Sequence, residues 1–188
     1  MNMTSFLSRL VALVLLVALS PVLIGLAFAC VISDGRPALF RQSRAGKSAE
    51  PFTLLKFRSM RDTRASNGEL LGDEERVTAF GRFLRRSRLD ELPGLVNVVR
   101  GEMTFVGPRP LLPATIRELG HDGVRRCSVK PGLTGWSQVN GNTLLTLEEK
   151  AALDLWYIDN RSALLDLKIL ALTFFVMFGG EKRRANIA

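Results

Sequence analysis

An uncharged apolar segment near the N-terminus constrains this chain more than any other feature. Residues 10–32 carry no charged side chain and, as one helix, are long enough to cross a bilayer. Ser20 and Pro21 lie mid-segment, and proline breaks the hydrogen-bond ladder of a helix. Three structures are open to it: a signal peptide cleaved near Ala27–Phe28–Ala29, a proline-kinked span, and a re-entrant hairpin of two half-helices.

Basic residues flank this segment on both sides. Arg9 precedes it, and four cations follow it: Arg36, Arg41, Arg44 and Lys47. A simple span would place one basic flank outside the cell, against the tendency of such flanks to stay cytoplasmic. The charges therefore favour two cytoplasmic ends, although the residues alone leave the kinked span open. The Ser20 hydroxyl is suited to bind the carbonyl that Pro21 frees one turn upstream.

Composition bounds the class of protein. The 188 residues are enough for one domain, and a net charge of +8 accompanies 47% hydrophobic residues. This pairing suits a protein that sits on anionic membrane lipids and binds an anionic substrate. Nucleic acid is not expected as a partner, because the aromatic residues lie in apolar runs and form no base-stacking platform. His121 is the single histidine, and the distant Cys30 and Cys127 suggest neither a disulfide nor a zinc site.

Two adjacent carboxylates, Asp90 and Glu91, precede Pro93 in a cationic stretch. The pattern up to Leu92 predicts a helix that Pro93 ends or kinks. Its apolar stripe comprises Phe80, Phe83, Leu84, Ser87, Leu89 and Leu92. Consecutive helical side chains point about 100° apart, so the two carboxylates share one site only near such a break. The alternative is a pair of surface ion pairs, Arg86–Asp90 and Arg88–Glu91, worth roughly 0.3 kcal/mol each.

A rigid arginine follows about seventeen residues later, in Gly107–Pro108–Arg109–Pro110. The two prolines restrict the backbone around Arg109, and its planar guanidinium can bind phosphate oxygens with two parallel hydrogen bonds. This arrangement suits a diphosphate substrate. A stiff loop whose arginine faces water is the alternative.

Together these motifs resemble a known family. Lys56–Met60, Leu89–Pro93, Val106–Pro110 and Lys130–Gly141 closely resemble the motifs of the bacterial sugar transferases, the monotopic phosphoglycosyl transferases, in the same order. The likeness covers nearly the whole chain. Gly94 stands where a polar residue such as glutamine is expected, and Val99 where leucine is usual, but neither difference involves a charged group.

The resemblance implies transfer of a phosphosugar from a UDP-sugar to a polyprenol phosphate, with undecaprenyl phosphate as the expected acceptor, and release of UMP. Asp90 matches the nucleophile, which would form an aspartyl phosphosugar, and Glu91 matches the second carboxylate of the dyad. Magnesium prefers one or two carboxylates and substrate phosphates, so both residues are its candidate ligands. Glu91 is left open between metal ligand and proton acceptor. For phosphate binding we rank Arg109 first, then Arg88 and Arg86.

Other polar residues of these motifs have two interpretations each. Lys56 and Arg58 either bind the nucleotide or pack a strand edge. Gln138 and Asn140, in the glycine-rich segment Lys130–Gly141, either contact uracil or sugar or belong to a segment whose glycines only shape turns.

We predict a mostly helical α+β fold. Residues 1–35 would form a re-entrant membrane hairpin and residues 36–188 a cytoplasmic catalytic domain. A β-hairpin is expected over residues 40–57, a polar loop near the site at 62–76, and helices at 111–119 and 146–160, the latter with a Thr146–Glu149 capping box. Ala45–Gly46–Lys47–Ser48 imitates the end of a phosphate-binding P-loop, but Arg41 replaces its first glycine, so that motif is rejected.

The C-terminal apolar segment, Leu164–Phe178, contains Asp166 and Lys168, which leaves too short a run to span a bilayer. We expect a helix in the membrane interface, with Lys182, Arg183 and Arg184 at the lipid headgroups; a buried core helix is the alternative. The predicted location is the cytoplasmic face of a bacterial cytoplasmic membrane. Two other functions remain: a basic lipid-binding scaffold, and a glycosyltransferase that releases UDP. The sugar, the glycan pathway and the oligomeric state stay open.

Overall fold

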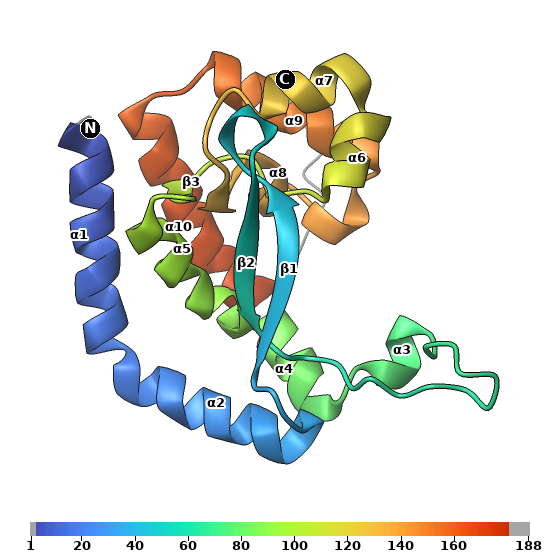
Figure 1. Cartoon of the computed structure of the whole chain (residues 1–188). Helices are drawn as coiled ribbons and strands as arrows, with labels where there is room; N and C mark the ends of the chain where they lie inside the picture. Colours follow the sequence, from blue (N-terminus) through green and yellow to red (C-terminus); the bar gives the residue numbers. More distant parts are fainter. Residues whose placement is uncertain (1–2, 181–188) are drawn as a thin grey trace.

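The computed structural model describes residues 3–180 and has a mostly helical α+β fold with two small two-stranded sheets (Figure 1). This agrees with the predicted fold class. Lys182, Arg183 and Arg184, for which contact with lipid headgroups is predicted, lie outside the described residues.

The apolar N-terminal segment forms two helices, α1 (Met3–Ala18) and α2 (Ser20–Asp34), which are bent by 65° at the predicted break. Pro21 cannot donate to the carbonyl of Val17 four residues earlier. The Ser20 hydroxyl donates to that carbonyl instead, at 2.7 Å, as expected. Within residues 3–180 no single helix has the length and apolarity to cross a membrane, and α1 and α2 pass that test only as a bent pair.

Both helices pack against the rest of the chain along one side. Ala12 of α1 is buried against Leu95 and Val98 of α5 (Leu95–Arg100), and Cys30 of α2 is buried with Phe57 and Leu84. In Figure 1, α1 runs beside α5 and α2 passes below α4 (Ala79–Arg86). Both helices also leave large apolar side chains exposed, among them Phe6, Leu10, Val14, Val17, Ile24, Phe28 and Ile32.

The predicted β-hairpin is confirmed. Strands β1 (Leu39–Ala45) and β2 (Pro51–Phe57) pair antiparallel around a short 3-10 turn, η1 (Lys47–Ala49). Side chains alternate between the faces of a strand, so Phe40, Gln42 and Arg44 share one face. The Asn97 side chain binds the free edge of β2: its amide nitrogen donates to Thr53 O, and its oxygen accepts from Leu55 N. This bond couples α5 to the hairpin.

The helix predicted to continue to Leu92 ends earlier, and this expectation was wrong. Helix α4 ends at Arg86, Arg88 adopts a left-handed conformation with φ of 59°, and Pro93 lies within a separate 3-10 helix, η2 (Leu89–Gly94). The Ser87 hydroxyl donates to the carbonyls of Phe83 and Leu84 and so competes with the backbone for them. The α-helix therefore ends before Asp90 instead of at Leu92.

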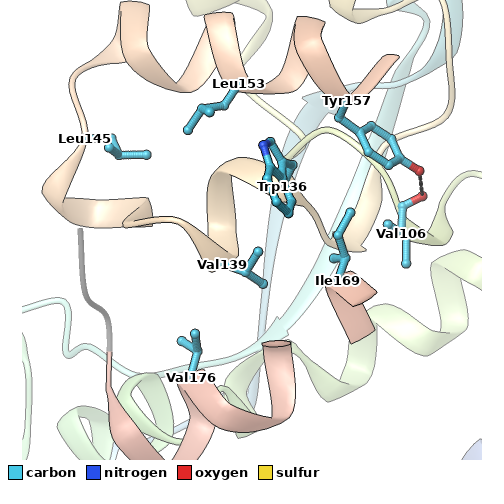
Figure 2. Close-up of a cluster of buried hydrophobic side chains, with 8 residues drawn as sticks. All are labelled: Val106, Trp136, Val139, Leu145, Leu153, Tyr157, Ile169 and Val176. Carbon is cyan, nitrogen blue, oxygen red and sulfur yellow. Dashed lines mark hydrogen bonds between the residues drawn. The ribbon is translucent and has the colours of Figure 1, made fainter. Parts of the chain in front are cut away.

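The remaining elements form the core behind the hairpin. Strands β3 (Thr104–Val106) and β4 (Gly132–Thr134) pair in parallel. Helices α8 (Trp136–Val139) and α9 (Leu147–Asp159) share one apolar cluster with β3, and the 3-10 turn η3 (Asn142–Leu144) packs on α8. Helix α6 (Pro113–Glu118) packs on β1 and on α7 (Gly120–Arg126), which in turn packs on α9. Figure 2 shows the largest apolar cluster, in which the Tyr157 hydroxyl donates to Val106 O at 3.4 Å. Helices are thus present at 111–119 and 146–160, as predicted.

Helix α10 (Ala163–Gly179) has one buried and one exposed apolar face. Ile169 and Val176 belong to the core cluster of Figure 2. The exposed face carries Leu164, Leu167, Leu170, Phe174, Phe175 and Phe178. A core helix would bury all of these side chains, so the buried-core interpretation accounts for only one face of α10.

The predicted capping box is present at the start of α9. The Thr146 side chain accepts from Glu149 N at 3.2 Å, and the Glu149 carboxylate accepts from Thr146 N at 2.8 Å. We expect Thr146→Ala to lower the free energy of unfolding by about 1 kcal/mol, because one helix N–H loses its acceptor. Thr146→Ser, which keeps the hydroxyl, serves as the control in denaturant unfolding. Equal stability of both variants would show that the cap contributes nothing.

Candidate active site

A cleft of about 500 Å³ opens on the hairpin face that carries Phe40, Gln42 and Arg44. Its other walls come from the end of β2, α4, η2, η3, the loop after β3 and residues 62–76, of which the last four form the short helix α3 (Asp73–Arg76). Seven cationic side chains line it, against four carboxylates: Arg44, Lys56, Arg58, Arg76, Arg85, Arg88 and Arg109 against Asp62, Asp73, Asp90 and Glu91. The cleft therefore carries an excess of positive charge suited to a polyanion. The placement of the 62–76 loop beside the site agrees with the prediction.

The two carboxylates of η2 have different surroundings. Glu91 is held by three cations: its Oε1 lies 2.7 Å from Lys56 Nζ and 3.1 Å from Arg109 Nη1, and its Oε2 lies 4.0 Å from Arg88 Nη1. Asp90 is buried, yet within residues 3–180 no hydrogen bond to its carboxylate is found. Glu91 thus organises the cations, while the Asp90 oxygens are left available for chemistry.

These surroundings separate the pKa values of the two groups. Burial, followed by repulsion from Glu91, raises the pKa of Asp90 to about 6. Burial also opposes ionisation of Glu91, but Arg109, Lys56 and Arg88 outweigh it and lower the Glu91 pKa to about 2. Glu91 is therefore ionised at neutral pH and is a poor proton acceptor. This favours an electrostatic role for it over general-base catalysis.

The loop that carries Arg109 is positioned by close backbone packing at Gly107. A Cβ at Gly132 would lie 2.2 Å from Gly107 N, and one at Gly135 would lie 2.1 Å from Gly107 O. A side chain at either position would collide with the backbone of Gly107. Both glycines are therefore needed for the Arg109 loop to pack against the chain around β4, in addition to any part they have in turns. The buried Arg126 side chain donates from Nη2 to Arg109 O at 3.1 Å and pairs with the buried Asp154.

The other predicted phosphate and nucleotide ligands divide into two groups. Lys56, Arg58 and Arg88 line the cleft, and Arg58 pairs with Asp62 at its rim. Arg86 is exposed at the end of α4 and is not among the described residues that line the cleft. No Arg86–Asp90 pair is present within residues 3–180, whereas Arg88 and Glu91 do meet.

The two amides of the glycine-rich segment also separate. Gln138 lines two small cavities that adjoin Glu91, and its Nε2 donates to Leu133 O. The Gln138 Oε1 is buried and has no partner within the described chain. Asn140 is buried and donates to Trp136 O at the end of α8, outside the described lining of the cleft. Its contacts are those of a helix cap.

Sequence reasoning missed several residues of the site. Arg44 was interpreted only as a flanking charge, yet it lines the cleft beside Arg109 and donates to Pro110 O at 3.2 Å. Burial, followed by repulsion from Arg109, lowers its pKa. The alternation of Phe40, Gln42 and Arg44 along a strand was the signal that could have identified it. The pair Arg126–Asp154 joins α7 to α9 and carries no comparable signal in the sequence.

The donors present fit a magnesium ion. Within residues 3–180 no group of three histidine, cysteine, aspartate or glutamate side chains could hold a metal. Asp90 and Glu91 would be the two protein ligands, since Mg²⁺ prefers one or two carboxylates completed by substrate phosphates and water. Lys56 and Arg109 engage Glu91 Oε1, whereas Oε2 has the longer contact, 4.0 Å to Arg88, and would be the oxygen that reaches a metal.

The raised pKa of Asp90 predicts a pH-dependent cost of folding. Above pH 6 the buried Asp90 of the folded protein is ionised, which lowers the free energy of unfolding. This loss disappears below the ordinary pKa of 3.8, where Asp90 is protonated in both the folded and the unfolded protein. In metal-free buffer we therefore expect Asp90→Asn to raise Tm at about pH 7 and to lose that gain toward about pH 4. Thermal unfolding of both proteins across this range is the measurement. A Tm difference that does not change with pH would contradict the assignment.

Comparison with known proteins identifies the chain. The family model described as "Bacterial sugar transferase" matches residues 2–180. An uncharacterized sugar transferase of Bacillus subtilis, EpsL, is 47% identical over 87% of this chain and 82% of its own length. A UDP-glucose:undecaprenyl-phosphate glucose-1-phosphate transferase of Escherichia coli is 41% identical over 89% of this chain, and a galactosyl transferase of Streptococcus agalactiae, CpsE, is 37% identical over 78%. These matches cover 38% and 36% of those two longer relatives. The predicted resemblance is thus confirmed, and the chain belongs to the bacterial sugar transferase family.

Proposed function

We propose that this protein transfers a phosphosugar from a UDP-sugar to undecaprenyl phosphate and releases UMP, the first membrane step in the synthesis of a glycoconjugate or polysaccharide. The observation that carries the proposal is the Asp90–Glu91 dyad at the floor of a cationic cleft. Relatives named for transfer of glucose 1-phosphate to undecaprenyl phosphate support it.

The chemistry would proceed in two displacements at one phosphorus. An Asp90 oxygen attacks the phosphorus that bears the sugar, an aspartyl–phosphate bond forms, and the bond to UMP breaks. A phosphate oxygen of the lipid then attacks the same phosphorus, the bond to Asp90 breaks, and the carboxylate is restored. Splitting the transfer in this way lets one cleft serve a nucleotide sugar and a lipid in turn.

Both displacements bring anions together, and the cleft offers the charge to offset this. Arg109 and Lys56 lie within hydrogen-bond distance of Glu91 and beside Asp90, so they can bind the oxygens of the diphosphate. Arg88 and Arg44 add charge at the same walls. Magnesium held by Asp90 and Glu91 would neutralise the charge that develops on the transferred group.

The same proposal places the active site at the cytoplasmic face of the membrane. The bent pair α1–α2 would enter the bilayer as a re-entrant hairpin, and the exposed apolar face of α10 would lie in the interface. The Ser20–Val17 bond supports the hairpin, because it satisfies the carbonyl that Pro21 frees without help from water. An acceptor lipid would then reach the cleft without leaving the membrane.

Nucleotide release tests the reaction. Purified protein in lipid nanodiscs is given undecaprenyl phosphate, magnesium and a panel of UDP-sugars, and the released nucleotide is identified. UMP is expected with at least one sugar, because the bond to UMP breaks in the first displacement. UDP would instead indicate a glycosyltransferase that cleaves the sugar–oxygen bond. Silence of folded protein across a broad panel would favour the lipid-binding scaffold.

A further inference from the structure

The protein has a second cavity that is larger than the active-site cleft. This second cavity, of about 590 Å³, is lined by the start of α1, the hairpin turn and the connection from α9 to α10. Figure 1 shows these three segments at the same end of the molecule. The second cavity shares no lining residue with the cleft around Asp90. The proposed transfer reaction therefore leaves it without a function.

Four cations from four separate segments line this second cavity: Arg9, Lys47, Lys130 and Arg161. The single carboxylate in its lining, Asp166, already accepts from the Tyr157 hydroxyl at 2.7 Å. Within residues 3–180 neither Lys47 nor Lys130 forms an ion pair with a carboxylate. Burial, followed by repulsion from Arg9 and Lys47, lowers the pKa of Lys130. The fold thus gathers positive charge that an anion would stabilise.

The neutral groups of the cavity suit a phosphate. Four serines, Ser5, Ser8, Ser128 and Ser162, share its lining with the cations, and the Ser162 hydroxyl also accepts from Leu165 N at 3.2 Å. The guanidinium of Arg9 is held in place against Gly101, where a Cβ would lie 1.8 Å from Arg9 Nη2. Phosphate oxygens accept from both guanidinium and hydroxyl donors. These donors come from four segments that are far apart in the sequence, so the cavity is formed by the tertiary fold.

The apolar surroundings point to a lipid as the source of that phosphate. On α1, Phe6 and Leu10 are exposed next to the lining residues Ser5 and Arg9. On α10, Leu167 is 63% exposed next to Asp166. A cationic cavity lined in part by two helices that also carry exposed apolar side chains matches a molecule with an anionic head and hydrocarbon chains. Inorganic phosphate would use the cavity and leave the apolar faces uncovered.

We propose that the second cavity binds the headgroup phosphate of an anionic phospholipid, separately from the lipid acceptor of the reaction. The bound lipid would bridge α1 to the hairpin turn through Lys47 and to the chain before β4 through Lys130. It would thereby hold the membrane helices against the catalytic domain. The inference rests on the membrane placement in the proposed function but not on the transfer reaction.

Thermal unfolding of the full chain in detergent tests this site. The probes are short-chain phosphatidylglycerol, phosphatidylcholine with the same acyl chains, and inorganic phosphate. The variant is Lys47→Gln/Lys130→Gln, and the matched control is Arg117→Gln/Lys150→Gln, which removes the same charge outside the lining of the cavity. We expect phosphatidylglycerol to raise Tm saturably in the parent and control, and to bind the variant about tenfold more weakly or worse.

Each other outcome overturns the proposal. If phosphatidylcholine raised Tm as much as phosphatidylglycerol does, the stabilisation would come from apolar contact and not from the anionic headgroup. If inorganic phosphate raised Tm as much, the site would be one for free phosphate. Equal binding by variant and control would indicate general surface charge.

Lys47→Arg/Lys130→Arg should retain binding, which excludes misfolding as the cause of a loss. Since binding is measured without turnover, Asp90→Asn should bind phosphatidylglycerol as the parent does, and the two proposals fail independently.

Discussion

Asp90→Asn is expected to abolish release of UMP while leaving the protein folded. Asparagine has nearly the shape of aspartate, but its amide cannot displace UMP from phosphorus. The loss should be about a thousandfold or more, as for removal of other covalent nucleophiles. Folding should not suffer, because Asp90 is buried with its pKa raised, so its charge opposes the folded state at neutral pH.

The control for this variant is another carboxylate of the same cleft. Asp73 lines the rim, is exposed, and lies 3.7 Å from Arg76 in a surface pair. Asp73→Asn removes the same charge with the same change of atoms, and we expect activity within a few fold of the parent. Nucleotide release by all three proteins is the measurement. Turnover by Asp90→Asn near the level of Asp73→Asn would exclude Asp90 as nucleophile.

Asp154→Asn is expected to cause the largest loss of stability of the changes considered. Asp154 and Arg126 are both buried and pair directly, so the variant leaves a buried guanidinium without its counter-charge. Breaking one partner of such a pair costs about 3 to 5 kcal/mol. The same α9 helix supplies the control, because Asp159 pairs with Arg125 at 2.6 Å on the exposed surface. Asp159→Asn should cost about 0 to 1 kcal/mol in the same denaturant titration.

A double variant separates the structural role of this pair from its role in the site. Replacing both partners by apolar residues, in Arg126→Met/Asp154→Leu, should recover much of the lost stability, since no buried charge remains. Activity should not recover, because Arg109 O loses the donor at 3.1 Å that fixes its loop. Recovery of both properties would show that the pair only supports the fold. Equal instability of Asp154→Asn and Asp159→Asn would contradict the assigned burial.

Local chemistry made several elements predictable. The bend at Ser20–Pro21, the hairpin and the Thr146 capping box each depend on residues close in sequence, and all three are present. The helix before the dyad was predicted too long. Hydrophobic spacing continues through Leu92, but the left-handed backbone conformation of Arg88 ends the helix. Hydrophobic spacing carries no information about the backbone conformation of one residue.

The family, the dyad, the broken apolar segment and the excess of cations could be predicted from the sequence, because they depend on residue types and their order. The distribution of the charges depends instead on the folded arrangement of the chain. That arrangement gives Glu91 the contacts of Lys56 and Arg109, leaves the Asp90 oxygens free, and turns Arg44 into the cleft. The reason is that solvation and Coulomb interaction depend on distances between segments far apart in the chain, which no local pattern encodes.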